Sequence, residues 1–452
     1  MRTPIHEFVT EYVASDTVRL HMPGHKGKNN LGCEALDITE ISGADALYEA
    51  SGIIRESEKN ATELFNTART LYSTEGSSQC VRAMLELARR WWQSRKKGAI
   101  RPVIVAARNV HKAFLYAAIL LDYDIVWMYG EEENSSLCSC VVTEEALRNV
   151  LTEYKDRVAA VYLTSPNYLG GMADISALAA VCHTHNTLLL VDNAHGAYLH
   201  FLEKAQHPLD LGADLCCDSA HKTLPVLTGG AYLHIGKNAP KELEQWAKGA
   251  MELFGSTSPS YLILQSLDLC NAYLEKGYRG RLARSCALIS ECKKYLVQAG
   301  WQMEETDPLR LTIKAPTGVS GVELSEKLRS GKIECEYADE DYLVLMATPE
   351  NQASDFDRLL SVLGENKEGY LAKKERKIPL ARSVQSAYSV REAYFLSGEV
   401  IPVECALGRI CRMPTASCPP AIPVVVPGEI IDEEAIQCFL YYGITEVEVV
   451  KE

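Results

Sequence analysis

The sequence predicts an α/β protein, with a mixed, mostly parallel sheet in a large domain and a smaller α+β region after it. Two observations lead to this fold class. Short apolar runs alternate with amphipathic stretches through the first half of the chain, which is the rhythm of β-α-β units. After about residue 275 the pattern changes to a helix followed by short strands and helices, which is typical of a small α+β domain.

The strands expected in the first half are Pro102–Ala106, Ile125–Met128, Ala159–Leu163, Thr187–Val191, Leu215–Cys217 and Ala231–Ile235. Between them, Ser78–Trp92 places its apolar residues at helical spacing. Thr143 and Asp174 are expected to start helices, because their side chains can cap backbone N–H groups. Nearly continuous apolar strands joined by helices predict a sheet that helices cover on both faces.

The second half begins with an expected helix at Arg281–Gln298. A β-α-β pattern follows at Leu309–Lys314, Val322–Arg329 and Tyr342–Thr348. After it come a charged linker at Glu365–Lys377 and a helix-like stretch at Ser383–Ser397. A proline-dense segment, Met413–Glu429, follows. Because proline has no N–H group, we expect this segment to form neither a regular helix nor a central strand.

Length, charge and cysteine usage predict a cytoplasmic enzyme. The 452 residues suffice for two or three domains, and the formal net charge of -14 argues against nucleic acid and anionic membranes as partners. The first residues contain no apolar core of signal-peptide length, and Phe114–Leu121 is too short to span a bilayer. The 15 cysteines form no Cys-x-x-Cys pairs, so we expect reduced thiols, mostly in the core.

Two features of the first half suit a cofactor with a phosphate and a flat ring. Gly76–Ser78 stand at the start of an amphipathic helix, where N–H groups and hydroxyls favour a phosphate, although such a sequence more often only caps the helix. His111 follows an expected strand. An imidazole there can stack on a cofactor ring, although a lone histidine is usually a surface or core residue.

Two charged residues complete the pattern. Asp192 ends an apolar strand, so its buried carboxylate needs a cationic partner, although a helix cap or a salt bridge would explain it equally well. Lys222 lies in CDSAHKTLPVLTGG, between the phosphate-type donors Ser219 and His221 and a Gly-Gly turn. A desolvated lysine becomes a nucleophile that can form an imine, whereas most lysines lie at the surface.

Together these residues are the parts of a pyridoxal phosphate site. The cofactor needs a phosphate cradle, a partner for the face of its ring, an anion for its ring nitrogen and a lysine that forms an imine. Each feature has an ordinary explanation by itself. Their order along the chain, each at the end of an expected strand, favours a common site.

The same residues lie within longer motifs. These are HMPGHKG (His21–Gly27), DITEISGADAL (Asp37–Leu47), YSTEGSSQC, RNVHKA, VDNAHGA, DSAHKTLPVLTGGAYLH, STSPSYLILQSLD (Ser256–Asp268), TDPLRLTI (Thr306–Ile313) and CPPAIPVVVPGE (Cys418–Glu429). With them the chain resembles, over nearly its whole length, the fold-type I Orn/Lys/Arg decarboxylases, whose fold is related to that of aspartate aminotransferase. Ser-x-His-Lys together with PGHKG and PPxIPxxxPGE is the specific part of this resemblance.

The resemblance implies pyridoxal 5′-phosphate as the cofactor and a role for each matching residue. Lys222 would be the Schiff-base lysine, Asp192 would pair with the ring nitrogen, and His111 would stack on the ring. Ala194 would lie under the ring and His195 near its 3-hydroxyl group. The residues implied for the phosphate are Gly76, Ser77, Ser78, Ser219 and His221, with Ser258 reaching it from a second subunit.

Four positions depart from the family pattern. Glu75 stands where asparagine is usual, and Asn193 stands where glutamate is usual. Cys418 replaces a tyrosine and Ala421 a glycine, in a segment thought to shape the substrate pocket. These last two departures bear on the identity of the substrate rather than on the use of the cofactor.

The resemblance also implies how the chain is organised. The expected parts are an N-terminal arm at 1–50 that contributes to the dimer and the active site, a cofactor-binding large domain at 51–280, a small α+β domain at 281–370 and a C-terminal decarboxylase-family domain at 371–452. The chain resembles the short form without the N-terminal wing domain. We expect a homodimer or higher homo-oligomer with the site at the subunit interface, a small amino acid as ligand, and neither nucleic acid nor a membrane as partner.

The expected reaction is decarboxylation of a basic amino acid, arginine or lysine rather than ornithine, to the amine and CO₂, as in polyamine-type metabolism. Lys222 or His111 would return a proton to the substrate carbon. The candidates for binding the distal cation of the substrate are Glu429, Asp45 and Glu40.

Two other functions stay open. An aminotransferase or aldolase-like enzyme with the same cofactor would need an arginine for the substrate carboxylate, and Arg310 is the candidate. A catalytically degenerate scaffold that binds the cofactor is the more remote one. We expect no metal site, since His183 and His185 alternate like a metal pair but follow a helix on a polar turn.

Overall fold

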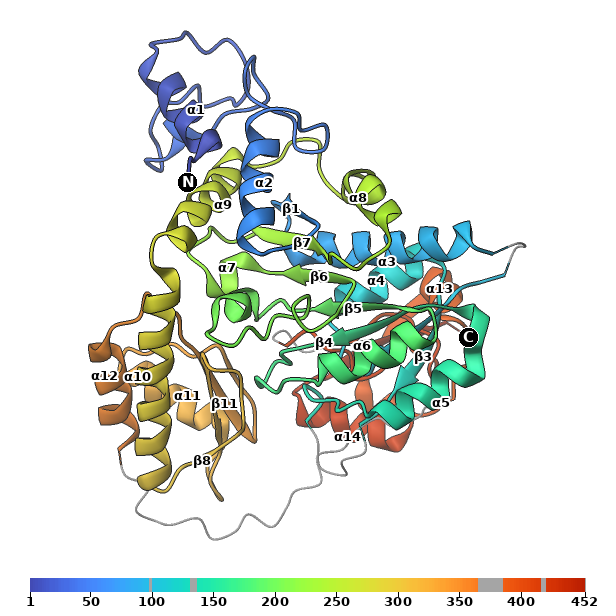
Figure 1. Ribbon diagram of the computed structural model, residues 1–452. Helices are drawn as coiled ribbons and strands as arrows, with labels where there is room; N and C mark the ends of the chain where they lie inside the picture. The colour runs from blue at the N-terminus through green and yellow to red at the C-terminus, as the bar shows by residue number, and fades with distance from the viewer. Residues whose placement is uncertain (97–99, 131–135, 365–384, 416–419, 452) are drawn as a thin grey trace. The chain divides into compact units, whose positions relative to one another are not determined.

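The computed structural model describes residues 1–96, 100–130, 136–364, 385–415 and 420–451 (Figure 1). The chain divides into two compact units. Unit 1 comprises Met1–Gly98 and Cys182–Gly280, and unit 2 comprises Ala99–Val181 and Arg281–Glu452. In the described part of the chain, no helix has both the length and the apolar character needed to cross a membrane.

Seven strands make up the large mixed sheet, and unit 1 holds four of them in the order β1-β7-β6-β5. They are β1 (Arg69–Ser73), β7 (Ala231–Ile235), β6 (Leu215–Asp218) and β5 (Leu188–Asp192). β5 and β6 are parallel, whereas β7 is antiparallel to both β6 and β1. The parallel pair brings two carboxyl ends, at Asp192 and Asp218, to one edge of the sheet.

The helices of unit 1 pack on this part of the sheet or on one another (Figure 1). They are α1 (Pro4–Ala14), α2 (Ile53–Leu64), α3 (Gly76–Ser94), α7 (Ala220–Thr223), α8 (Lys241–Leu253) and α9 (Tyr261–Glu275). Two 3-10 turns, η1 (Glu34–Leu36) and η3 (Ala197–Phe201), also belong to unit 1. α3 packs on β5, β6 and β7, so its N-terminus lies near the functional edge of the sheet.

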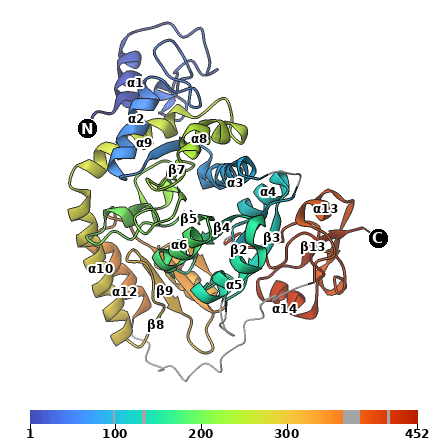
Figure 2. The same ribbon diagram turned by 45° about the vertical axis from the view of Figure 1, so that its right-hand side comes forward.

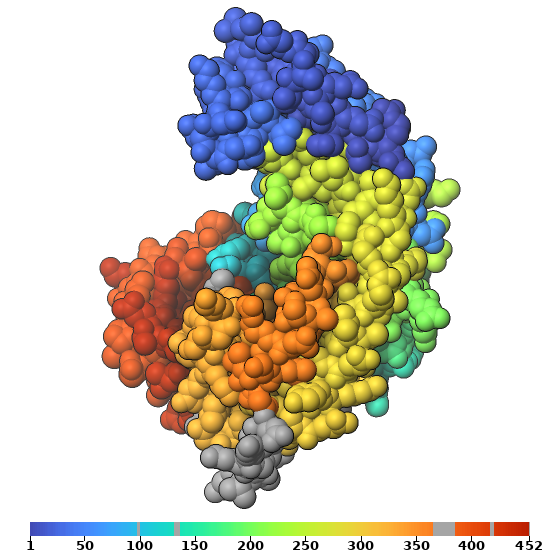
Figure 3. All heavy atoms as spheres, turned by 90° about the vertical axis from the view of Figure 1, so that its left-hand side faces the viewer, coloured from blue at the N-terminus to red at the C-terminus, as the bar shows by residue number. Residues whose placement is uncertain are grey.

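The N-terminal arm rests on α9. α1 contacts both α2 and α9, and Figure 3 shows the blue atoms of the arm lying on the yellow atoms of α9. Asp268 of α9 fixes the first turn of α1, because its Oδ2 accepts hydrogen bonds from the backbone N–H groups of Ile5 (2.9 Å) and His6 (3.0 Å).

Unit 2 holds the other three strands of the large sheet, in the order β4-β2-β3. They are β4 (Val158–Thr164), β2 (Val103–Ala107) and β3 (Asp124–Met128), and they are parallel. The helices between them are α4 (Lys112–Leu121), α5 (Glu144–Tyr154) with the 3-10 turn η2 (Lys155–Arg157), and α6 (Ile175–Thr184). Buried, nearly uninterrupted apolar strands with crossover helices are the physical basis of this parallel arrangement.

The rest of unit 2 contains two smaller sheets. The first, in the order β10-β11-β9-β8, is antiparallel and consists of β10 (Tyr337–Ala338), β11 (Tyr342–Met346), β9 (Arg310–Lys314) and β8 (Gln302–Met303). Its helices are α10 (Tyr278–Gln298), α11 (Gly321–Ser330) and α12 (Ala353–Leu363). The second pairs β12 (Gly398–Pro402) with β13 (Glu446–Val450), near α13 (Val390–Phe395), the 3-10 turn η4 (Val403–Cys405) and α14 (Glu433–Tyr441), as Figure 2 shows.

The structure confirms the predicted α/β class and each of the six predicted strands to within one residue at either end. The helices predicted to follow Thr143 and Asp174 are α5 and α6. β1 was not predicted, because RTLYS has little apolar character. Among the described strands it stands at the edge of the sheet and pairs with the antiparallel strand β7. The cysteines in the described part of the chain are free thiols, most of them buried, as predicted.

The helix-like stretch Ser383–Ser397 is shorter than predicted. Only Val390–Phe395 is helical, because Ser389 caps this helix and Glu392 completes a capping box. Residues 383–384, the linker at 365–377 and Cys418 lie outside the described residues. The division into four parts at residues 50, 280 and 370 stays a prediction.

Candidate active site

Most of the predicted cofactor residues belong to unit 1 and follow two parallel strands. Asp192 ends β5, and His195 follows it. Ser219 and Lys222 follow β6, and Lys222 lies in the short helix α7. Carboxyl ends of neighbouring parallel strands form the usual binding edge of an open α/β sheet. The fold therefore brings these residues to one edge.

The residues predicted to bind a phosphate, Gly76–Ser78, stand at the N-terminus of α3. Gly76 begins the helix at φ +70°, and no atom lies within 4 Å of a Cβ built on it. The residue that precedes it, Glu75, makes no side-chain cap. Ser219 Oγ donates a hydrogen bond to Ser77 Oγ at 2.9 Å, so hydroxyls from α3 and from the lysine segment meet here. Open space, helix N–H groups and hydroxyls are what a phosphate requires.

Lys222 lies beside a histidine from the neighbouring strand end. Its Nζ is 2.8 Å from Nε2 of His195, whose ring is buried. The two side chains are therefore joined by a hydrogen bond, in which an ammonium group can donate to the imidazole nitrogen. The sequence placed both residues in one site, and the structure adds their direct contact.

Asp192 is buried, as the apolar strand before it predicted. Its Oδ1 accepts hydrogen bonds from the Ala194 backbone N–H (3.2 Å) and from the Cys217 thiol (3.5 Å). Ala194 therefore lies directly beside this carboxylate. A buried carboxylate in such surroundings favours a cationic partner.

The Gly-Gly turn explains how the chain returns from α7 to β7. His221 donates its backbone N–H and the proton on Nδ1 to the Gly230 carbonyl, at 3.2 and 3.0 Å. Burial lowers the pKa of the His221 imidazole. A Cβ on Gly230 would collide with Val226, so the close turn requires glycine. The Nδ1 edge of His221 thus holds the turn.

Glu75, which replaces the usual asparagine, is turned toward the segment before α9. Its Oε1 accepts a hydrogen bond from the Ser256 backbone N–H. Ser256 Oγ in turn accepts from the Ser258 backbone N–H at 3.1 Å, and Ser258 is exposed. The carboxylate of Glu75 therefore ties the start of α3 to the Ser256–Ser258 segment.

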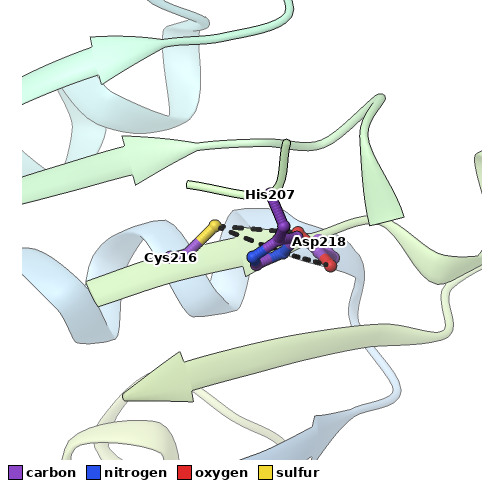
Figure 4. A group of neighbouring side chains, drawn as sticks. All are labelled: His207, Cys216 and Asp218. Carbon is purple, nitrogen blue, oxygen red and sulfur yellow. Dashed lines mark hydrogen bonds and ion pairs between the residues drawn. The ribbon is translucent and has the colours of Figure 1, made fainter. Parts of the chain in front are cut away.

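A fully buried carboxylate, Asp218, directly precedes Ser219 (Figure 4). Its Oδ1 accepts from Asn193 Nδ2 at 2.7 Å, and its Oδ2 lies 3.1 Å from both His207 Nε2 and His234 Nε2. Burial alone would raise the pKa of the Asp218 carboxyl, but the two imidazoles outweigh it and hold this pKa below its usual value. Burial lowers the pKa of the His234 imidazole, and its Nε2 donates to the carboxylate.

Three side chains of this cluster bring potential metal ligands together. In the described part of the chain, one potential ligand atom from each of His207, Cys216 and Asp218 lies within 4.8 Å of the other two (Figure 4). The Leu209 backbone N–H donates to Nδ1 of His207 at 3.3 Å, which leaves the ring proton on Nε2, facing Asp218. Because a protonated nitrogen cannot ligate a metal ion, these residues form a hydrogen-bonded cluster in this structure.

Two of the predicted site residues lie in unit 2. His111 is the N-cap of α4, and its Nδ1 accepts the Ala113 backbone N–H at 3.1 Å. Glu429 is buried, accepts the Val426 backbone N–H at 2.7 Å and lies 3.4 Å from Nη2 of Arg108. Burial raises the pKa of Glu429, and Arg108 opposes that rise. The carboxylate of Glu429 is thus engaged inside unit 2.

Ala421 stands where the family usually has glycine, and its backbone has a conformation that favours glycine. Its φ is +59°, in the left-handed region that disfavours a Cβ. Its carbonyl accepts the Lys112 backbone N–H at 3.0 Å, at the start of α4. The chain therefore keeps a glycine-type conformation there with alanine in place.

The two N-terminal carboxylates predicted to bind substrate differ from each other. Asp45 is buried and accepts backbone N–H groups from Ser51 (3.0 Å), Gly52 (2.8 Å) and Ile54 (3.1 Å), so it caps the start of α2. Glu40 is exposed. The cap was not predictable from the sequence, because Asp45 lies eight residues before α2 and reaches it across a loop.

Arg310, the candidate carboxylate clamp of an aminotransferase, is almost fully buried in unit 2. Its Nη1 donates to the Tyr168 carbonyl at 2.6 Å, and its Nε lies 3.5 Å from Asp307 Oδ2. The guanidinium group thus has internal partners. His183 likewise has one, since its Nε2 lies 3.1 Å from Asp214 Oδ2.

Sequence reasoning missed the cluster around Asp218. The signal was available for Asp218, which ends an apolar strand as Asp192 does, and for His234, a polar residue within the apolar run of β7. For His207 the sequence carries no comparable signal, because it lies in an irregular segment after η3.

Comparisons with known proteins agree with this geometry. Residues 3–315 match the family model described as Orn/Lys/Arg decarboxylase, major domain. An arginine decarboxylase of Bacillus subtilis (strain 168) is 27% identical over 96% of this chain and 92% of its own length. One of Halalkalibacterium halodurans is 26% identical over 96% of this chain and 91% of its own length.

Solved structures agree in fold. Lysine decarboxylase A from Pseudomonas aeruginosa matches with a TM-score of 0.81 and 17% identity, over 99% of this chain and 80% of its own. The Francisella novicida lysine decarboxylase LdcF matches with a TM-score of 0.79 and 16% identity, over 99% of this chain and 81% of its own. These likenesses confirm the predicted fold-type I architecture.

Proposed function

Because this chain belongs to the Orn/Lys/Arg decarboxylase family, we propose that it decarboxylates a basic amino acid to the amine and CO₂, with arginine as the preferred substrate. Two relatives at 26–27% identity over nearly the whole chain are named arginine decarboxylases, which supports arginine ahead of lysine and ornithine. The observation that carries the proposal is Lys222 paired with His195 at the edge where Ser219 meets Ser77.

Pyridoxal 5′-phosphate is the cofactor that the family and the fold indicate. The residues of unit 1 fit it. The N-terminus of α3 with Ser77 and Ser219 would hold the phosphate, and Asp192 would face a protonated ring nitrogen. When bound, the cofactor withdraws electrons from the bond that breaks, and the protein supplies position and charge.

The side chains of this chain move and hold protons around that group. Lys222 Nζ and His195 Nε2 lie 2.8 Å apart, and we propose that Lys222 delivers a proton to the substrate carbon after CO₂ leaves. The carboxylate of Asp192 would face the ring cation. His111, predicted to stack on the ring, remains the alternative proton donor.

The distal cation of the substrate needs a carboxylate, and the three candidates differ in what they already bind. Asp45 holds the start of α2, and Glu429 meets the buried Arg108. We therefore propose exposed Glu40 as the first to test. Its change to glutamine should raise KM for arginine more than it lowers kcat.

A direct assay tests the reaction. Purified protein with cofactor and arginine, lysine or ornithine should release CO₂ and the matching amine, with the largest kcat/KM for arginine. Lys222→Ala should abolish turnover and the visible absorbance of the bound cofactor. The control Lys241→Ala, at the exposed start of α8, should preserve both.

Two other outcomes would contradict the proposal. Release of a keto acid without CO₂ would identify an aminotransferase. Bound cofactor without turnover of any of the three amino acids would identify a catalytically degenerate scaffold.

We further propose a cytoplasmic homodimer, or a higher homo-oligomer, that works in polyamine-type metabolism, with Ser258 reaching the phosphate of the partner subunit. Light scattering would measure the oligomeric state. Mixing Lys222→Ala subunits with Ser258→Ala subunits should restore activity if the site is shared, since some hybrid sites are then intact.

A further inference from the structure

One buried hydrogen bond joins the ends of β5 and β6. Asn193 Nδ2 donates to Asp218 Oδ1 at 2.7 Å, and both side chains are fully buried. Asn193 directly follows Asp192, and Asp218 directly precedes Ser219. The bond therefore connects the residue next to the ring-nitrogen partner with the residue next to the phosphate cradle.

Asp218 cannot turn away from this bond without leaving other buried donors unpaired. Its Oδ2 takes a hydrogen bond from His207, in the segment before β6 (Figure 4), and another from His234 of β7, each at 3.1 Å. His234 is itself fixed by Thr70 of β1, whose Oγ1 lies 2.8 Å from its Nδ1. Unpaired buried donors are costly, so the carboxylate is held in one orientation.

Asn193 is fixed as firmly. Its backbone N–H donates to the Cys217 carbonyl at 3.0 Å, and its own carbonyl accepts the Gly196 N–H at 2.8 Å. A Cβ on Gly196 would collide with Asn193 Oδ1, so the glycine leaves room for the amide. The glutamate that is usual at this position would bring a second carboxylate toward Asp218, whereas an amide is the complementary group.

We propose that Asn193 and Asp218 are positioning residues that fix the distance between the two ends of the cofactor site. Asp192 stands at one end of the site. Ser219 stands at the other end, and Lys222 lies three residues after Ser219. The cofactor would span both ends, so its affinity and its fixed orientation depend on this bond. The inference rests on the proposed cofactor site and not on the identity of the substrate.

Exchanging the two groups tests the proposal. The variants are Asp218→Asn, Asn193→Asp and the double exchange, and the measurements are the dissociation constant for pyridoxal 5′-phosphate and the visible circular dichroism of the bound cofactor. Asn193→Asp brings two carboxylates together, and Asp218→Asn turns an N–H donor group toward side chains that themselves donate, so we expect affinity to fall about tenfold or more and the dichroism to weaken. The double exchange restores a carboxylate facing an amide. It should recover at least half of the lost cofactor affinity, measured as the logarithm of the dissociation constant, and at least half of the lost dichroism.

A matched control separates positioning from general stability. Asp214, just before β6, is also buried, accepts the Leu189 backbone N–H at 2.8 Å and pairs with His183. Asp214→Asn disturbs the same two strands at their opposite ends. It should lower thermal stability and leave the dissociation constant within about twofold of the wild-type value.

Three results would overturn the inference: single variants that bind the cofactor as the wild type does, a double exchange no better than the weaker single variant, or an equal loss in Asp214→Asn. Because cofactor binding is measured without turnover, these results are distinct from a failure of the decarboxylase assay. A wild-type protein that does not bind the cofactor would refute the proposed function itself.

Discussion

Strand β6 has a carboxylate beside histidine at each end, and the two ends differ. Asp214, directly before the strand, pairs with His183, whose side chain is 44% exposed. Asp218, its last residue, meets His207 and His234, which are 2% and 0% exposed. The hydrogen bond to Asp214 raises the pKa of His183, whereas burial lowers the pKa of His234.

The difference shows that burial, and not the residue types, decides what such a pair does. A half-exposed histidine can keep its proton and form an ion pair that solvent screens. A fully buried one, such as His234, has its pKa lowered by burial and donates a hydrogen bond with fixed geometry. The buried end is the one that continues into Ser219 and Lys222, where fixed geometry is needed.

The largest expected effect comes from removing the two carboxylates. Asp218→Ala leaves Asn193, His207 and His234 without their acceptor, so we expect the free energy of unfolding of the cofactor-free protein to fall by about 3–5 kcal/mol. Asp214→Ala should cost about 1–3 kcal/mol. Denaturant unfolding followed by circular dichroism measures both, and equal losses would refute the contrast between the two ends.

A smaller effect should follow from Thr70→Val. The change keeps the shape of the side chain but removes the hydroxyl that contacts His234 Nδ1 at 2.8 Å. We expect a loss of about 1 kcal/mol, measured by the same unfolding experiment. In the Asp218→Ala background, Thr70→Val should lower the free energy of unfolding by less than it does in the wild type, because the His234 ring that Thr70 orients has then lost its acceptor.

The smallest effect is in the pH dependence, and its sign differs between the ends. The raised pKa of His183 contributes stability below about pH 6.5 that is lost as pH rises through the folded-state value. His183→Gln should therefore cost more at pH 6 than at pH 9, by a few tenths of a kcal/mol because the pair is half exposed.

His234 should show the opposite trend. Its lowered pKa means that the unfolded chain takes up the proton first, so wild-type stability falls below about pH 6.5. The cost of His234→Gln should thus be smaller at pH 5 than at pH 8. Unfolding free energies at the two pH values test this, and parallel trends for the two histidines would show that burial does not separate them.

How far the sequence predicts this molecule depends on the kind of interaction. Strands made mainly of apolar residues are visible as short apolar runs, so the parallel strands β2 to β6 and the antiparallel strand β7 were predictable, whereas β1 has mixed character and was not. Lys222 and Asp192 were predictable because a strand end and a motif coincide there. The pairing of Asp218 with His207 and His234 was not, because it depends on the strand order β7-β6-β5, which a single sequence does not give.

The candidate substrate residues show the same limit. Asp45 and Glu429 were chosen for their charge, and the structure gives each carboxylate an internal partner. A carboxylate that caps a helix across a loop, or meets a buried arginine more than 300 residues away, cannot be told from a ligand-binding one by sequence position. Only the contacts distinguish them.

The pairing of β1 with β7 also has a consequence for synthesis. Arg69 of β1 lies opposite Ile235 of β7, and the whole of Ala99–Val181 is made between them. At about 5–20 residues per second, β1 and the apolar face of α3 wait on the order of ten seconds for their partner strand. The sheet of unit 1 is therefore expected to be completed late in synthesis, after β7 has left the ribosome.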